Sequence, residues 1–128
     1  MEGLSENQKQ FFKEEGYLVI EDLLSEEEVS YYSNLYNSFL DNSIDALKYR
    51  SDLSGDSTKE EKITQIMVPS KLVPELLKQT LHQKTLQIAK MLLGDDIELD
   101  FDMLINKPPY SNSITPWHQD VAYWIDMP

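Results

Sequence analysis

The sequence predicts an α+β fold, because helical and strand periodicities occupy different parts of the chain. In the N-terminal half apolar side chains recur every three or four residues, and near the C-terminus they alternate with polar ones over residues 97–105. The residues at helical spacing are Val29, Tyr32, Leu35, Tyr36 and Phe39. A length of 128 residues suits a single domain over residues 1–128. We therefore expect helices first and a sheet last.

Two capping boxes predict where the first helices begin. Gln8 follows Ser5 by three residues, and Glu28 follows Ser25 by the same spacing, so each pair can satisfy N–H groups at a helix start. Gly16 is placed to end the first helix in a left-handed turn.

The second helix is expected to end near residues 41–42. Residues 17–20, between the two helices, are aromatic and β-branched and predict a short strand. Residues 42–61 are polar and predict a surface loop with one helical turn inside it. Residues 63–68 predict another strand, which Pro69 ends.

Two more helices and the main strand complete the prediction. Pro74 suits the first turn of a helix, and a longer helix follows with Gly94 at its end. Over residues 97–105 one strand face is expected to be buried, with Asp100 and Asp102 on a polar face. The residues of the expected buried face are Ile97, Leu99, Phe101, Met103 and Ile105. A further strand is expected from Ile114, and because strand signals continue to residue 128, the chain is interpreted as the front part of a larger β-structure.

Composition excludes several classes of function. Acidic residues outnumber basic ones 23 to 11, for a net charge of -12, and Arg50 is the only arginine, so the chain has no basic stripe for nucleic acid. No long apolar run predicts a membrane span or a secretory signal. Without cysteine there is no disulfide and no thiolate chemistry. We expect an acidic cytoplasmic protein with no nucleic-acid, membrane or evident protein partner.

The candidate for chemistry is the run His118-Gln119-Asp120. On a strand, residues two apart point to the same face, so the imidazole and the carboxylate can converge on one ion. They would be two thirds of the facial triad that holds non-heme Fe(II). The spacing alone favours the alternative of an exposed strand whose His and Asp share a hydrogen bond.

Two separated segments resemble the phytanoyl-CoA dioxygenase family. One is residues 12–28, with Gly16 and Tyr17 before an apolar run and then an acidic helix start; the other is residues 101–124, with Lys107-Pro108-Pro109 and then Trp117-His118-Gln119-Asp120. The resemblance covers almost the whole chain in the right order. It implies N-terminal helices packed on a double-stranded β-helix (a jelly-roll, cupin-like sheet), incomplete in this chain, and Fe(II)- and 2-oxoglutarate-dependent hydroxylation.

The resemblance also implies roles for individual residues. His118 and Asp120 would be iron ligands, and an acid at position 120 favours hydroxylation over halogenation. Met103 would line the 2-oxoglutarate pocket, which Lys62 or Gln65 could also approach. Gln119 would support the ligand strand from its other face. Tyr123 and Trp124 would shape the mouth of the cavity.

The chain also departs from the family pattern. The family's third iron ligand is a distal His, followed by an Arg that pairs with 2-oxoglutarate, and neither is found among these 128 residues. Arg50 lies in the wrong half of the chain, and His82 is expected to be a partly exposed helix residue. The chain by itself is therefore expected to be an inactive fragment.

Two functions from different classes remain open at this point. The first is an oxygenase acting on an aliphatic substrate, either a small molecule or a chain tethered to a carrier. The alternative is a non-catalytic binding or interaction protein that retains the front half of the fold. The intact His118-Gln119-Asp120 run favours the first, and the missing distal His and Arg favour the second.

Overall fold

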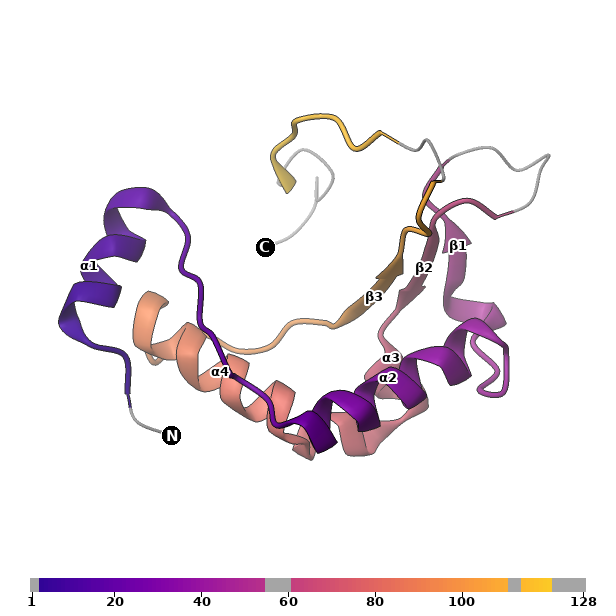
Figure 1. Cartoon of the computed structure of the whole chain (residues 1–128), viewed down its shortest axis with the longest axis horizontal. Coiled ribbons are helices and arrows are strands. Elements are labelled where there is room, and N and C mark those ends of the chain that lie inside the picture. The colour runs from indigo at the N-terminus through magenta and orange to yellow at the C-terminus, as the bar shows by residue number, and fades with distance from the viewer. Residues whose placement is uncertain (1–2, 55–60, 111–113, 121–128) are drawn as a thin grey trace.

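A computed structural model describes residues 3–54, 61–110 and 114–120. It shows helices together with one antiparallel sheet of three strands in the order β1–β2–β3, so the predicted α+β class is confirmed. The helices α2 and α4 lie below the sheet in Figure 1, and α1 stands apart from the sheet beyond the end of α4. Two of the strands precede α4 in the chain, so the expected order of helices first and sheet last is wrong.

Both predicted capping boxes are present. Helix α1 (Glu6–Glu15) begins after Ser5, whose Oγ accepts from the N–H of Gln8 at 3.3 Å, and Gly16 ends it at a φ of 80°. Helix α2 (Glu26–Leu40) begins after Ser25, whose N–H donates to Oε2 of Glu28 at 2.8 Å. These local hydrogen bonds satisfy helix-end donors without tertiary contacts, which is why the sequence alone locates them.

The segment expected to be a loop contains ordered structure. Residues Leu47–Tyr49 form the 3-10 helix η1, and Arg50–Asp52 form strand β1. The guanidinium of Arg50 donates from Nη1 to the carbonyls of Phe39 and Leu40 at 3.2 and 3.3 Å, at the C-terminal end of α2. Its Nε also lies 2.9 Å from a carboxylate oxygen of Glu61. The tertiary contacts of Arg50 thus stabilise strand β1 in a polar segment whose propensity predicts a loop.

The other middle elements follow the predictions more closely. Strand β2 (Thr64–Met67) ends before Pro69, and α4 (Thr80–Leu93) ends at Gly94. Between them lie the short helix α3 (Pro69–Leu72) and the 3-10 helix η2 (Pro74–Lys78), so Pro74 begins a 3-10 turn where an α-helix was expected. The hydroxyl of Tyr32 on α2 accepts from the N–H of Leu81 at 3.0 Å and so caps the start of α4.

Strand β3 (Met103–Asn106) is shorter than expected, and its buried face is the opposite one. Leu104 and Asn106 are opposite Ile66 and Thr64 of β2 and face the helices, whereas Met103 and Ile105 are 42% and 46% exposed. The hydroxyl of Tyr36 on α2 donates to Oδ1 of Asn106 at 2.6 Å. That hydrogen bond lets a polar residue occupy the helix-facing side, which reverses the alternation expected from apolarity alone.

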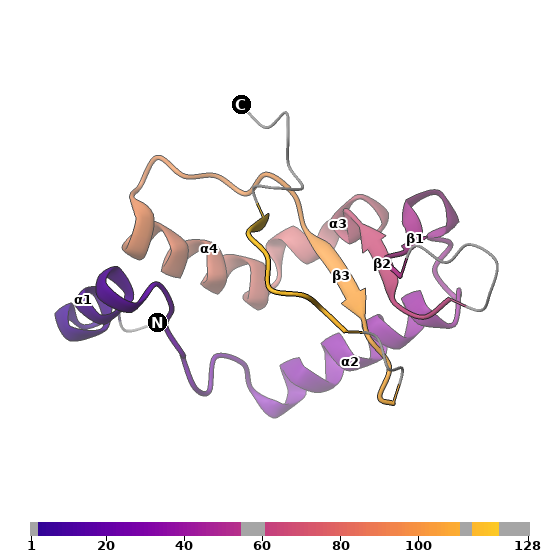
Figure 2. The ribbon, with the colours of Figure 1, turned by 90° about the horizontal axis from the view of Figure 1, so that it is seen from above.

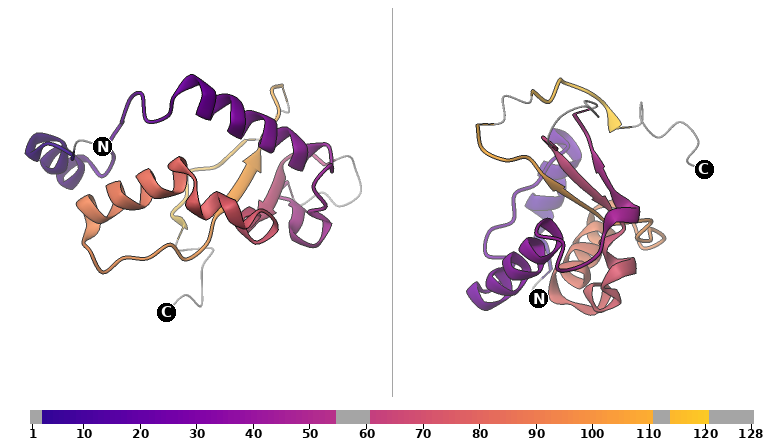
Figure 3. Two further views of the ribbon diagram at one scale, coloured as in Figure 1. Left: turned by 90° about the horizontal axis from the view of Figure 1, so that it is seen from below. Right: turned by 90° about the vertical axis from the view of Figure 1, so that its right-hand side faces the viewer.

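Two further strand predictions are wrong for the residues described. Residues 17–20 and 114–119 have no strand pairing, and Tyr17, Val19, Ile114 and Trp117 are exposed. A strand needs a neighbour to satisfy its backbone groups, and neither segment has one among the residues described. Residues 114–120 lie on the side of the sheet opposite to the helices, as Figure 1 and the right panel of Figure 3 show.

The core lies between the helices and the sheet. Phe39, Ala46 and Ile66 are fully buried, with Leu35 and Leu104 among the residues packed around them. In Figure 2 the helices α2 and α4 diverge beneath β3, and this arrangement leaves the opposite sheet face uncovered by helices. In the part of the chain that the structure describes, no helix has the length and apolarity needed to cross a bilayer.

Candidate functional site

The structure brings His118 and Asp120 together without a strand. Nε2 of His118 lies 3.3 Å from Oδ1 of Asp120, and their side chains are 35% and 66% exposed. The segment bearing them is tethered beside the end of β3, because Nζ of Lys107 donates to Oγ1 of Thr115 at 3.0 Å. The two side chains therefore approach each other without strand pairing, and the strand geometry predicted for residues 118–120 is wrong.

A second contact fixes the orientation of the His118 ring. Nδ1 of His118 lies 2.7 Å from the carbonyl oxygen of Pro116. A carbonyl oxygen only accepts, so Nδ1 carries the hydrogen and Nε2 of the neutral ring is a lone-pair acceptor. Nε2 therefore faces the Asp120 carboxylate, and the two atoms can share a proton or a cation. An Nδ1–H bonded to a backbone carbonyl is also the usual orientation of a metal-binding histidine.

Met103 and Gln65 lie together on the open face of the sheet, the face that α2 and α4 leave uncovered. The Nε2 atom of Gln65 is 2.9 Å from Sδ of Met103 and 2.8 Å from Sδ of Met67. Met67 and Met103 are directly opposite in the β2–β3 register. Lys62 precedes β2, where its backbone N–H donates to Asp52 at 3.2 Å. Lys62 lies two residues before Thr64 and four before Ile66, which face the helices. By the alternation of a strand it therefore belongs with these residues and not on the face of Gln65.

The remaining predicted residues are only partly placed. Gln119 is exposed between the two candidate ligands, so no strand face separates it from them. Tyr123 and Trp124 lie outside the described residues. Within residues 3–54, 61–110 and 114–120, no three His, Asp or Glu side chains gather into a group that could hold a metal.

The other histidine takes part in a cluster that sequence reasoning missed. Nε2 of His82 on α4 lies 3.2 Å from Oδ2 of Asp102, and Asp102 also accepts from the N–H and Oγ of Ser70 at 3.1 and 2.7 Å. Both ionisable side chains are largely buried, so His82 is less exposed than expected. The 20-residue separation of His82 and Asp102 offers no sequence signal, since the two residues belong to different elements that no local pattern connects.

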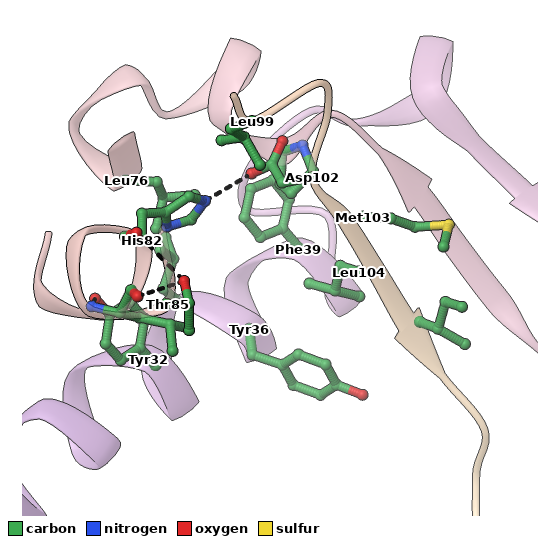
Figure 4. A pocket seen from close by; sticks show the side chains of 14 residues that line it. Tyr32, Tyr36, Phe39, Leu76, His82, Thr85, Leu99, Asp102, Met103 and Leu104 are labelled. Carbon is green, nitrogen blue, oxygen red and sulfur yellow. Dashed lines mark hydrogen bonds and ion pairs between the residues drawn. The ribbon is translucent and has the colours of Figure 1, made fainter. Parts of the chain in front are cut away.

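This cluster stands at one end of a cavity of about 530 Å³ between the helices and the sheet. In Figure 4, His82 and Asp102 meet near Leu99, and Leu104 points toward the cavity. Tyr36 also lines the cavity, and burial raises the pKa of its phenol. Leu104 lines the cavity from the helix-facing side of β3, and Met103 and Ile105 of the same strand also contribute to its lining.

A family model and curated proteins match this chain. The family model described as phytanoyl-CoA dioxygenase (PhyH) matches residues 12–128. The chain is 30% identical over 133 residues to the peroxisomal phytanoyl-CoA dioxygenase of Bos taurus, covering 98% of this chain and 40% of that protein. It is 24% identical over 121 residues to the ectoine dioxygenase of Sphingopyxis alaskensis, covering 94% of this chain and 39% of that protein.

The chain thus spans about two fifths of the length of the curated relatives it matches. No solved structure matches it. The family match extends over most of the chain and includes both the first helix boundary at Gly16 and the His118-Gln119-Asp120 run. The chain therefore belongs to the phytanoyl-CoA dioxygenase family.

Proposed function

We propose that this chain is part of an Fe(II)- and 2-oxoglutarate-dependent dioxygenase and carries two of its iron ligands, His118 and Asp120. The observation that supports this most directly is the facing pair of acceptors, Nε2 of His118 and Oδ1 of Asp120, 3.3 Å apart. Family membership supports the same assignment. We also propose that β1, β2 and β3 belong to a double-stranded β-helix, in which the open sheet face is the interior.

The donor set fits the proposed metal. An imidazole nitrogen and a carboxylate oxygen are two members of the 2-His-1-carboxylate triad that holds Fe(II) with open positions. When bound, iron and 2-oxoglutarate would together activate O2, so that one oxygen atom enters an aliphatic C–H bond of the substrate and the other enters the succinate formed, with CO2, from 2-oxoglutarate. His82, the second of the two histidines in the sequence, is engaged with Asp102 among the helices, on the other side of the sheet from residues 114–120.

The chain's own residues would orient the site in three ways. The Pro116 carbonyl holds the His118 ring with Nε2 toward Asp120. The Lys107–Thr115 hydrogen bond ties this segment to the end of β3. Gln65 and Met103 would present a polar amide and soft thioethers to 2-oxoglutarate on the open face. Lys62, Gln119, Tyr123 and Trp124 stay predictions for the surrounding pocket.

The substrate is proposed only as a class. The two relatives are named for an acyl-CoA and for ectoine, one carrier-tethered and one a free small molecule. We propose an aliphatic substrate that takes one of these two forms.

The test is anaerobic titration calorimetry of Fe(II) into the protein, with and without 2-oxoglutarate. We expect weak but saturable binding, because two of the three ligands of the triad lie in this chain. 2-Oxoglutarate should strengthen it, and His118→Ala and Asp120→Ala should each abolish it. Matched controls for Fe(II) binding without 2-oxoglutarate are His82→Gln, which changes the other imidazole, and Asp95→Ala, which removes an exposed carboxylate after α4. Both controls should bind Fe(II) alone like the wild type.

Binding that persists in His118→Ala would contradict the ligand assignment. If the wild type shows no Fe(II) binding with or without 2-oxoglutarate, the proposal fails and the non-catalytic binding protein becomes the better account.

A further inference from the structure

The carboxylate of Asp102 joins three elements at the start of β3. It accepts from the N–H and the Oγ of Ser70 in α3 at 3.1 and 2.7 Å, and it lies 3.2 Å from Nε2 of His82 in α4. Its backbone carbonyl accepts from the N–H of Val68, at the end of β2, at 2.8 Å. The side chains of His82 and Asp102 are only 15% and 13% exposed, so these contacts are shielded from water.

Two features of the contacts around Asp102 lower the stability of the fold. Val68 is β-branched yet has φ 48° and ψ 52°, a left-handed conformation in which the Cβ atom crowds the backbone. Nδ1 of His82 is buried with no hydrogen-bond partner among the described residues. A buried polar atom without a partner keeps its full desolvation cost. Such costs persist where the surrounding geometry is needed for something beyond stability.

The residues that these contacts hold are next in the chain to residues on the open face of the sheet. Val68 follows Met67 in the chain and Asp102 precedes Met103, and these two methionines are opposite each other in the register. Their sulfur atoms lie 2.8 and 2.9 Å from the amide nitrogen of Gln65. The hydrogen bonds on the helix side therefore hold the strand ends whose next residues form the Gln65–Met67–Met103 cluster.

We propose that Asp102, supported by His82 and Ser70, is a positioning residue for 2-oxoglutarate: it fixes Met67 and Met103 on the open face. This assignment rests on the proposed function. Asp102 acts through the backbone of β3 and lies on the helix side of the sheet, so it does not contact the cosubstrate.

The first measurement follows the methionine methyl groups by ¹³C NMR, without metal or cosubstrate. We expect Asp102→Ala to shift the signals of Met67 and Met103 and to leave that of Met91 unchanged. Met91 is the internal control, because it lies on α4 within reach of Gly3 and not on the sheet. Asp102→Asn should restore the wild-type signals, since its oxygen can still accept from Ser70 and its amide can pair with the other tautomer of His82. Unchanged Met67 and Met103 signals in Asp102→Ala would overturn the proposal.

The second measurement separates the two affinities by anaerobic calorimetry. We expect Asp102→Ala to weaken 2-oxoglutarate binding to the Fe(II)-loaded protein about tenfold or more, as outer partners of a site do. Fe(II) affinity through His118 and Asp120 should be unchanged, and a purely structural role would lower both together. Ser70→Ala, which removes one hydroxyl, is the milder variant if Asp102→Ala does not fold, and it should show the same split at smaller size.

The outcomes distinguish the two proposals. If the wild type binds Fe(II) and 2-oxoglutarate and the folded variants bind 2-oxoglutarate equally well, only the positioning role of Asp102 is wrong. If the wild type binds neither, the proposed function fails and this assignment fails with it.

Discussion

At the scale of single residues, Asp52 shows how one carboxylate can organise a loop. It accepts from the N–H and Oγ of Ser54 at 2.8 and 2.7 Å and from the N–H groups of Lys62 and Ile63 at 3.2 and 3.1 Å. These hydrogen bonds, those from Ser54 first, hold the pKa of Asp52 far below its usual range. The ionised carboxylate therefore closes the base of the connection between β1 and β2.

The sign of the pH dependence follows from that lowered pKa. Because the folded pKa lies below the unfolded one, the stabilisation is complete above the ordinary Asp value of about 4 and is lost as the pH falls below it. We expect Asp52→Asn to lower the free energy of unfolding at about pH 7, with a difference from the wild type that shrinks toward about pH 3. Urea unfolding at several pH values measures this.

The control is Asp95→Asn, which changes an exposed carboxylate in the turn after α4. It should leave the difference from the wild type small at every pH. A constant destabilisation by Asp52→Asn across the whole range would show that the carboxylate acts through shape and not through its charge.

At the scale of elements, α2 and α4 are joined through a helix end. Gln79 precedes α4 and provides no side-chain cap, and the hydroxyl of Tyr32 accepts the N–H of Leu81 in its place. We expect Tyr32→Phe to cost about 1 kcal/mol of unfolding free energy, the usual effect of a lost cap. Tyr31→Phe, on the exposed neighbouring ring, should stay within about 0.5 kcal/mol of the wild type.

Chemical denaturation of the three proteins measures these differences. Equal midpoints for Tyr32→Phe and the wild type would mean that water replaces the cap and that the ring alone holds the two helices together.

Among the elements, those set by neighbouring residues can be predicted from the sequence, and those set by distant contacts cannot. The capping boxes at Ser5 and Ser25 and the end at Gly94 depend on neighbours within a few residues, and they are confirmed. Strand β1 was missed because Arg50 makes it by capping α2 from a distance, and the buried face of β3 was assigned wrongly because Tyr36 makes a polar residue acceptable there. The Asp102–His82 contact joins residues on different elements, which no local pattern encodes.

At the scale of the whole molecule, the negative net charge opposes association of chains through their exposed apolar side chains. Trp117, Ile114 and Ile105 are 105%, 87% and 46% exposed, while the chain carries a net charge of -12. Charge repulsion keeps such chains apart until salt shortens the Debye length from about 10 Å at 0.1 M to about 3 Å at 1 M. We expect the average mass by light scattering to rise over that range.

Trp117→Ser should reduce the rise. Val19→Ser changes another exposed apolar residue, in the segment between α1 and α2, and should leave the rise unchanged. An average mass that does not respond to salt would mean that the exposed side chains do not drive association.

The alternation of the two sheet faces also limits how this gene can change. Along β2 and β3 every second residue faces the helices, and the others form the open face. Inserting or deleting one codon within either strand would exchange the faces, placing Gln65 in the core and Ile66 on the open side. Evolution can therefore substitute residues along these strands but not alter their length by one. Insertions and deletions are better tolerated in connections such as residues 53–63, because there they do not change which strand residues face the helices.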